Sequence, residues 1–140
     1  PNRKTMNSET IYITEKDYWR IKSLFEHYSA HDFDKENLEI ELERASILAD
    51  NEVPPNLVTM NTRFRFKKML SGEERVVTLI YPSANMPSDN VISILSPLGI
   101  ALIGLSLNQE INYQFSNNKL ERLKILEILY QPEAEKHWSL

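Results

Sequence analysis

The chain of 140 residues contains no cysteine and only three glycines. Without cysteine there are no disulfides, no thiolate catalysis and no zinc site with cysteine ligands, and this is typical of a cytoplasmic protein. The three glycines do not form a phosphate-binding loop or a dinucleotide fingerprint. No apolar run approaches the roughly 18 residues of a membrane-spanning helix, and the N-terminal residues lack a signal-peptide core. We therefore expect a cytoplasmic protein without a membrane partner.

Acidic residues are concentrated in one part of the chain. The formal net charge is −4, and residues 15–50 hold ten acids and five bases, whereas residues 51–140 hold nine of each. Binding to free nucleic acid depends on clustered cations, so this composition argues against strong binding to free nucleic acid. The pattern predicts an acidic piece joined to a neutral one.

The acidic piece has the periodicity of two helices. Apolar residues recur three or four apart in two stripes, which are Tyr18, Ile21, Phe25 and Tyr28, then Leu38, Leu42, Ala45 and Ala49. Thr14 is a candidate N-cap with Asp17 at the third helical position. We expect helices at about 15–29 and 35–49, paired as a short antiparallel coiled coil.

Strand patterns dominate after Pro54–Pro55, a pair that cannot continue a helix. Strands are expected at 58–68, 75–82 and 91–95, a short helix capped by Ser96 with Pro97 at its first position, and a strand hairpin from "EINYQF" and "LERLKILEILY". The predicted fold class is α+β, with a helical hairpin in residues 1–52 and a sheet domain in residues 53–140.

One strand, "VTMNTRFRFKK" at 58–68, carries a row of cations. Arg63, Arg65 and Lys67 alternate with Phe64 and Phe66, so the basic side chains share one face and the aromatic ones face the core. This pattern predicts either an ordinary solvated face or an electrostatic contact for an acidic protein or a phosphate.

Clustered carboxylates mark the turn between the predicted helices. Asp32, Asp34 and Glu36 lie there with Glu39, and this cluster is either a solvated turn or a Mg²⁺ site. His27 and His31 have metal-chelating spacing, but no third ligand is evident. We expect no metal, no cofactor and no catalytic residue.

Five stretches in order give the chain a family resemblance: "LVTMNTRFRF", "VVTLIYP", "SPLGIALIGL", "EINYQF" and "LEILYQPEA". The chain resembles the Rnk family, regulators of nucleoside diphosphate kinase, which are related to the transcript-cleavage factors GreA and GreB. This resemblance implies an FKBP-like domain in which a bent antiparallel sheet embraces a short helix. It also implies docking on RNA polymerase at the rim of the secondary channel, through Leu95, Ser96, Pro97 and Leu98. Gre-type sequences often have an acid where this chain has Leu95.

The resemblance also bears on the turn. Gre factors place two carboxylates in a D-x-x-E pattern at the tip of a long hairpin, where they help to bind a second Mg²⁺. In "DFDKEN" the position three before Glu36 is Phe33, and the acids lie on either side of it. Stimulation of transcript cleavage is therefore not expected, and the short arms argue in the same direction.

Three functions are left open at this point. The first is a non-enzymatic transcription regulator that binds RNA polymerase and competes with Gre-type factors. The second is a direct regulator of nucleoside diphosphate kinase or another metabolic protein. The third is a prolyl isomerase, because the implied fold is FKBP-like.

Overall fold

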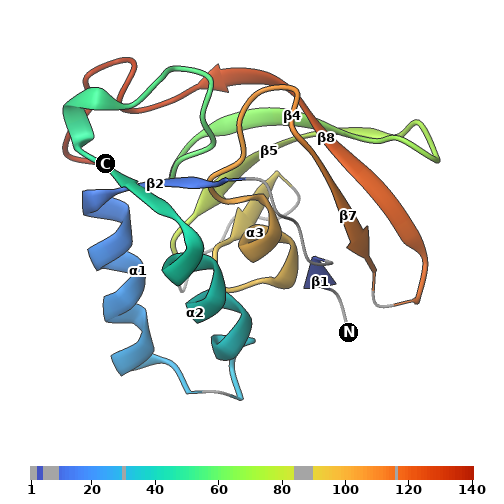
Figure 1. The fold of residues 1–140 in the computed structure, drawn as a ribbon, viewed down its shortest axis with the longest axis horizontal. Helices are drawn as coiled ribbons and strands as arrows, with labels where there is room; N and C mark the ends of the chain where they lie inside the picture. The colour runs from blue at the N-terminus through green and yellow to red at the C-terminus, as the bar shows by residue number, and fades with distance from the viewer. Residues whose placement is uncertain (1–2, 5–9, 30, 84–89, 116) are drawn as a thin grey trace.

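The computed structural model describes residues 3–4, 10–29, 31–83, 90–115 and 117–140, and its fold is α+β (Figure 1). Two N-terminal helices, α1 (Glu15–His27) and α2 (Lys35–Arg44), precede a sheet that arches over a short helix, α3 (Pro97–Leu102). The sheet has six strands in the order β1-β7-β8-β4-β5-β6. In chain order they are β1 (Arg3–Lys4), β4 (Arg63–Lys68), β5 (Glu74–Ile80), β6 (Val91–Ser93), β7 (Glu110–Gln114) and β8 (Leu120–Tyr130).

Helix α1 begins where the capping residue predicts. The Thr14 hydroxyl accepts a hydrogen bond from the Asp17 backbone N–H at 3.0 Å, which satisfies one of the unpaired donors of the first turn. Ile21 is fully buried, and Tyr18, Phe25 and Tyr28 pack against the same core. The predicted inward stripe is therefore confirmed.

Helix α2 is shorter than expected, and this corrects the predicted span of 35–49. It ends at Arg44, and Ser46–Leu48 form strand β3, which pairs in parallel with β2 (Tyr12–Thr14). The Ser46 N–H donates to the Ile11 carbonyl at 2.9 Å. Pairing with a distant strand has overridden the local helical pattern. An arm of 10 residues is too short for a coiled coil of several heptads.

The sheet differs from the expectation in two respects. It is mixed, because β5 and β6 are parallel while the other pairings are antiparallel. Strand β4 starts only at Arg63, since residues 59–62 form a turn in which the Thr62 N–H donates to the Thr59 carbonyl at 3.2 Å. The predicted alternation within β4 is confirmed, with Phe64 and Phe66 fully buried.

One hydrophobic core joins the helices to the sheet. It contains Ile21 of α1 and Leu38 of α2 together with side chains of β4, β5, β8 and α3. The C-terminal residues fold back onto this unit, because the Gln131 amide donates to the carbonyls of Pro54 and Leu57 at 2.9 and 2.8 Å. Within the described residues, no helix combines the length and apolarity that crossing a bilayer requires.

Candidate functional site

The loop that enters α3 is the first candidate surface. Ser96 caps the helix, since its hydroxyl accepts from the Gly99 N–H at 3.1 Å and donates to the Ser93 carbonyl at 2.7 Å. Leu95 is only 9% exposed and belongs to the core. Ser96, Pro97 and Leu98 are partly exposed, so a partner would touch these three residues and very little of Leu95.

Much of the "SPLGIALIGL" motif has a structural explanation. A Cβ on Gly99 would lie 2.1 Å from the Ser93 carbonyl oxygen, so only glycine lets α3 pack against the end of β6. Gly104 has φ +81°, and its site is also crowded by Tyr12. The motif therefore builds the loop, and the exposed part that a partner would contact is small.

The tip of the helical hairpin is the second candidate surface. Asp32 accepts hydrogen bonds from the N–H and hydroxyl of Ser29, at 2.8 and 3.2 Å. Asp34 caps α2 by accepting from the Asn37 N–H at 3.1 Å. Phe33, between the two aspartates, is only 8% exposed and stacks on Phe25 with ring centroids 5.8 Å apart.

These contacts bear on metal binding at the tip. Asp34 caps α2 and Asp32 holds the turn through Ser29, while the ring of Phe33 occupies the position where the family resemblance implies a carboxylate. Within the described part of the chain, no group of three or more histidine, aspartate or glutamate side chains is arranged to hold a metal ion. Glu36 is exposed, as are His27 and His31.

The cations of β4 form the third candidate surface, and they differ in their neighbours. Arg65 is ion-paired with Glu127 at 3.3 Å and with Glu74 at 3.7 Å, so its charge is partly neutralised. Arg63 is exposed at the start of the strand, and Lys67 is half-buried opposite Lys124 of β8. All three lie on the outer face, as the alternation predicts.

A buried carboxylate, expected from the sequence only as part of the Thr14 capping motif, connects the hairpin to the sheet domain. Asp17 is 3% exposed and accepts hydrogen bonds from the Met60 N–H and from the Tyr81 hydroxyl, both at 3.0 Å. A capping box predicts that this side chain contacts Thr14 at the start of the helix. The spacing in the sequence indicates a different role, because Asp17 is four residues before Ile21 and therefore lies on the buried face of α1.

Burial changes the titration of this cluster. Desolvation raises the pKa of Asp17 above 3.8, although the hydrogen bonds from Met60 and Tyr81 oppose the shift. Desolvation and the nearby Asp17 carboxylate raise the pKa of Tyr81. Burial also raises the pKa of Glu133, which accepts a hydrogen bond from the Thr59 hydroxyl at 2.7 Å. The shifted groups of Asp17 and Tyr81 lie where α1 meets the sheet domain, and they hold these parts of the fold together.

Comparison with known proteins identifies the family. The model of the GreA/GreB transcription elongation factor C-terminal domain matches residues 53–130, and the Rnk N-terminus model matches residues 10–48. The regulator of nucleoside diphosphate kinase of Escherichia coli K12 is 37% identical over 131 residues, covering 92% of this chain and 96% of that protein. The chain belongs to the Rnk family.

Similar proteins named as elongation factors agree with the match to the GreA/GreB C-terminal domain. The transcription elongation factor GreA of Treponema pallidum strain Nichols is 33% identical over 98 residues, which cover 70% of this chain and 58% of that factor. A solved structure titled prokaryotic transcription elongation factor GreA/GreB from Nitrosomonas europaea has a TM-score of 0.71 and 38% identity. It covers 88% of this chain and 100% of its own. An Rnk protein of this kind carries the curled, FKBP-like half-barrel of the GreA/GreB C-terminal domain, and the family implies a role related to RNA polymerase and transcription.

Proposed function

We propose that this chain is a non-enzymatic transcription regulator that binds RNA polymerase near the secondary channel and competes there with Gre-type factors. The observation that carries the proposal is the match of residues 53–130 to the GreA/GreB C-terminal domain behind a family-specific N-terminal hairpin. The partly exposed residues of the α3 loop, Ser96, Pro97 and Leu98, are the proposed docking contact.

The dimensions of the hairpin support a role in which it occupies the polymerase channel and does not stimulate transcript cleavage. Its arms, of 13 and 10 residues, are about 20 and 15 Å long at about 1.5 Å per residue. Phe33 fills the core at the position where a metal-binding carboxylate would be needed for transcript cleavage. In this proposal the hairpin fills the mouth of the channel. Its carboxylates, Asp32, Asp34 and Glu36, repel the phosphates of nucleotides.

The decisive experiment is equilibrium binding of the labelled chain to core RNA polymerase, with unlabelled GreA as competitor. We expect binding that GreA abolishes, and no increase in transcript cleavage when Mg²⁺ is present. Leu98→Asp should weaken the binding at least about tenfold, because a carboxylate would replace an apolar contact. Leu140→Asp, at an exposed leucine near the end of the tail, is the matched control. Lack of binding at micromolar concentrations contradicts the proposal.

The name of the Escherichia coli relative favours a second candidate, direct binding to nucleoside diphosphate kinase. Titration of the purified kinase with this chain, by calorimetry, separates the two. Saturable binding to the kinase without binding to polymerase would replace the first proposal with the second.

A further inference from the structure

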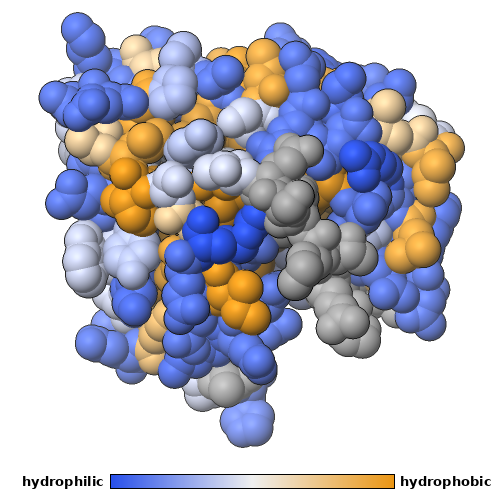
Figure 2. All heavy atoms as spheres, viewed as in Figure 1, coloured by the Kyte–Doolittle hydropathy of each residue, from blue (hydrophilic) through white to orange (hydrophobic). Residues whose placement is uncertain are grey.

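The end of the sheet farthest from the helical hairpin exposes aliphatic side chains. The side chains of Leu70 and Leu120 are 73% and 58% exposed, and Met69 beside Leu70 is 38% exposed. Leu70, Leu120 and Arg122 line a groove of about 360 Å³. We call Met69, Leu70, Lys119, Leu120 and Arg122 the distal surface. Figure 2 shows hydrophobic side chains at the edge of the molecule where the β4–β5 hairpin ends.

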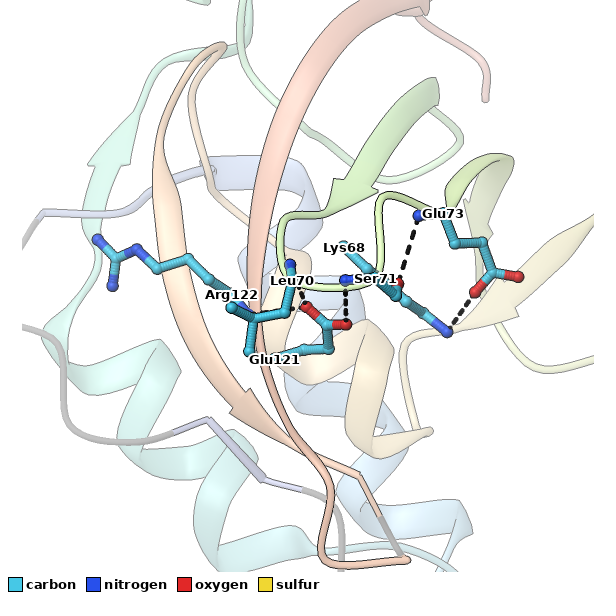
Figure 3. A network of polar contacts seen from close by, with 6 residues as sticks. All are labelled: Lys68, Leu70, Ser71, Glu73, Glu121 and Arg122. Carbon is cyan, nitrogen blue, oxygen red and sulfur yellow. Dashed lines mark hydrogen bonds and ion pairs between the residues drawn. The ribbon is translucent and has the colours of Figure 1, made fainter.

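A buried carboxylate of the neighbouring strand β8 holds the turn that carries Leu70. The carboxylate of Glu121, itself 3% exposed, accepts hydrogen bonds from the N–H groups of Leu70 and Ser71 at 3.0 and 3.1 Å (Figure 3). Burial favours a higher pKa for Glu121, but these hydrogen bonds together outweigh it and lower the pKa. The Gly72 N–H closes the turn by donating to the Lys68 carbonyl at 2.7 Å. Leu70 is therefore exposed on a turn that these hydrogen bonds hold in one conformation, which reduces the entropy cost of binding.

The distal surface is also basic. Residues 67–75 and 115–124 together with Glu110, the partner of Arg122, hold six bases and four acids, which gives this end a net charge of +2 in a chain of −4. Within the described residues, Lys68 is paired with Glu73 at 2.6 Å and Arg122 with Glu110 at 2.9 Å. Lys119 is exposed on the rim. Exposed leucines flanked by cations suit an acidic protein segment with an aliphatic side chain, since nucleic acid would instead favour aromatic stacking platforms.

The chain itself carries such a segment. Glu36, Ile40 and Glu43 of α2 are spaced by four and three residues, so they form one stripe on the helix, and all three are exposed. Ile40 is 51% exposed, whereas Leu38 and Leu42 of the same helix are buried. We call Glu36, Ile40 and Glu43 the outer face of α2. Residues 26–44 hold seven acids and two bases, a net charge of −5.

We propose that the outer face of α2 of one copy docks on the distal surface of a second copy, so that the chain self-associates head to tail. The helical hairpin and the end of the β4–β5 hairpin lie at opposite corners of the molecule in Figure 1, so the two surfaces of one copy do not meet. A symmetric pairing of two distal surfaces would bring two positive ends together, which is electrostatically unfavourable. Ile40 packs between Leu70 and Leu120, and its flanking carboxylates face the cations of the rim.

The contact has a consequence that rests on the proposed function. A copy whose hairpin is held by its neighbour cannot insert that hairpin into a polymerase channel, so self-association stores the regulator in an inactive form. Because the contact is small and charged, it is weak and depends on salt. Self-association is measured on the isolated chain, so its failure and the failure of polymerase binding are separate results.

The first experiment is sedimentation velocity of the full chain from about 10 to about 500 µM at low salt. We expect the average mass to rise above the 16.4 kDa of the monomer with concentration, and to return toward it at about 0.5 M NaCl. The distal variant, Leu70→Ser with Leu120→Ser, and the outer-face variant, Ile40→Ser with Glu43→Lys, should each weaken association at least about tenfold. Leu140→Ser is the control at an exposed leucine outside both surfaces.

A mixing experiment distinguishes a head-to-tail contact from a symmetric one. In an equimolar mixture, the outer-face variant supplies an intact distal surface and the distal variant supplies an intact outer face. They should form a dimer and no larger species, because neither can extend the chain further. The altered side chains are exposed, and circular dichroism spectra that match the unaltered chain establish that the variants fold.

Two results would overturn the proposal. One is a monomer at every concentration and salt, which would leave the distal surface for an acidic segment of a different protein. The other is self-association that both variants leave unchanged, or a mixture that does not form a dimer, because either would place the contact elsewhere.

Discussion

The buried carboxylate of Asp17 is the joint between the hairpin and the sheet domain, and Asp17→Ala tests how strongly it holds them together. The substitution leaves the Met60 N–H buried without its acceptor and removes the acceptor of the Tyr81 hydroxyl. A hydrogen bond to a charged acceptor contributes roughly 1.5–3 kcal/mol, so the two bonds contribute about 3–6 kcal/mol. Relief from burying the carboxylate, seen in its raised pKa, offsets part of this loss.

We therefore expect Asp17→Ala to lower the free energy of unfolding by about 2–4 kcal/mol. For a chain of this size the melting temperature should fall by about 6–12 °C. Urea unfolding monitored by circular dichroism, with the slope of the transition fitted as well as its midpoint, measures the loss. Because α1 packs against the same core as the sheet, both parts should unfold in one transition in the unaltered chain.

Tyr81→Phe is the matched variant, since it removes one hydrogen bond and keeps the ring. It should cost about 1 kcal/mol, and the double variant should cost less than the sum of the two single ones. A loss below about 0.5 kcal/mol in Asp17→Ala would refute the reasoning, because it would mean that the buried bonds contribute no more than the cost of burying the carboxylate.

Three further predictions follow from individual contacts. Because burial raises the pKa of Asp17, the native state binds more protons than the unfolded chain just above pH 3.8, and stability is lost as the pH rises through the native pKa. The unaltered chain should therefore lose stability relative to Asp17→Asn as the pH rises above about 4 in urea unfolding, and a constant difference would contradict this. Gly99→Ala should cost at least about 2 kcal/mol in the same assay because its Cβ meets the Ser93 carbonyl at 2.1 Å, and a neutral effect would refute the close approach. Phe33→Ala should cost about 3 kcal/mol through loss of the stack on Phe25, and a solvent-exposed ring would instead cost almost nothing.

Local signals were sufficient for several elements. The start of α1 at Thr14, the cap and proline of α3 and the alternation of β4 all depend on residues within a few positions of one another, and each is confirmed. The hairpin of β7 and β8 is confirmed as well. The sequence also predicts a loop at residues 83–90, between the second and third expected strands, and residues 84–89 of it lie outside the described part of the chain.

Two of the errors involve partners distant in the sequence, whereas the late start of β4 comes from a local turn at residues 59–62. Residues 46–48 continue a helical pattern, but pairing with β2 makes them a strand. The sheet is mixed because β6 reaches β5 in the parallel sense after a connection through residues 81–90. The family resemblance implies a docking role for Leu95, which stays a prediction, and the structure adds that Leu95 is only 9% exposed. The roles of the docking loop, the hairpin tip and the cations of β4 stay predictions.

The sequence by itself determined the α+β class, the acidic hairpin ahead of a neutral domain, and the family, because periodicity, charge and motif order are properties of the linear chain. Only the tertiary structure decided which polar groups are buried and which apolar ones are exposed. Asp17 and Glu121 are buried acceptors because segments far apart in the chain pack over them. Leu70 and Ile40 are exposed because no other described segment covers them. No local pattern encodes such contacts, since burial depends on what the rest of the fold places over a side chain.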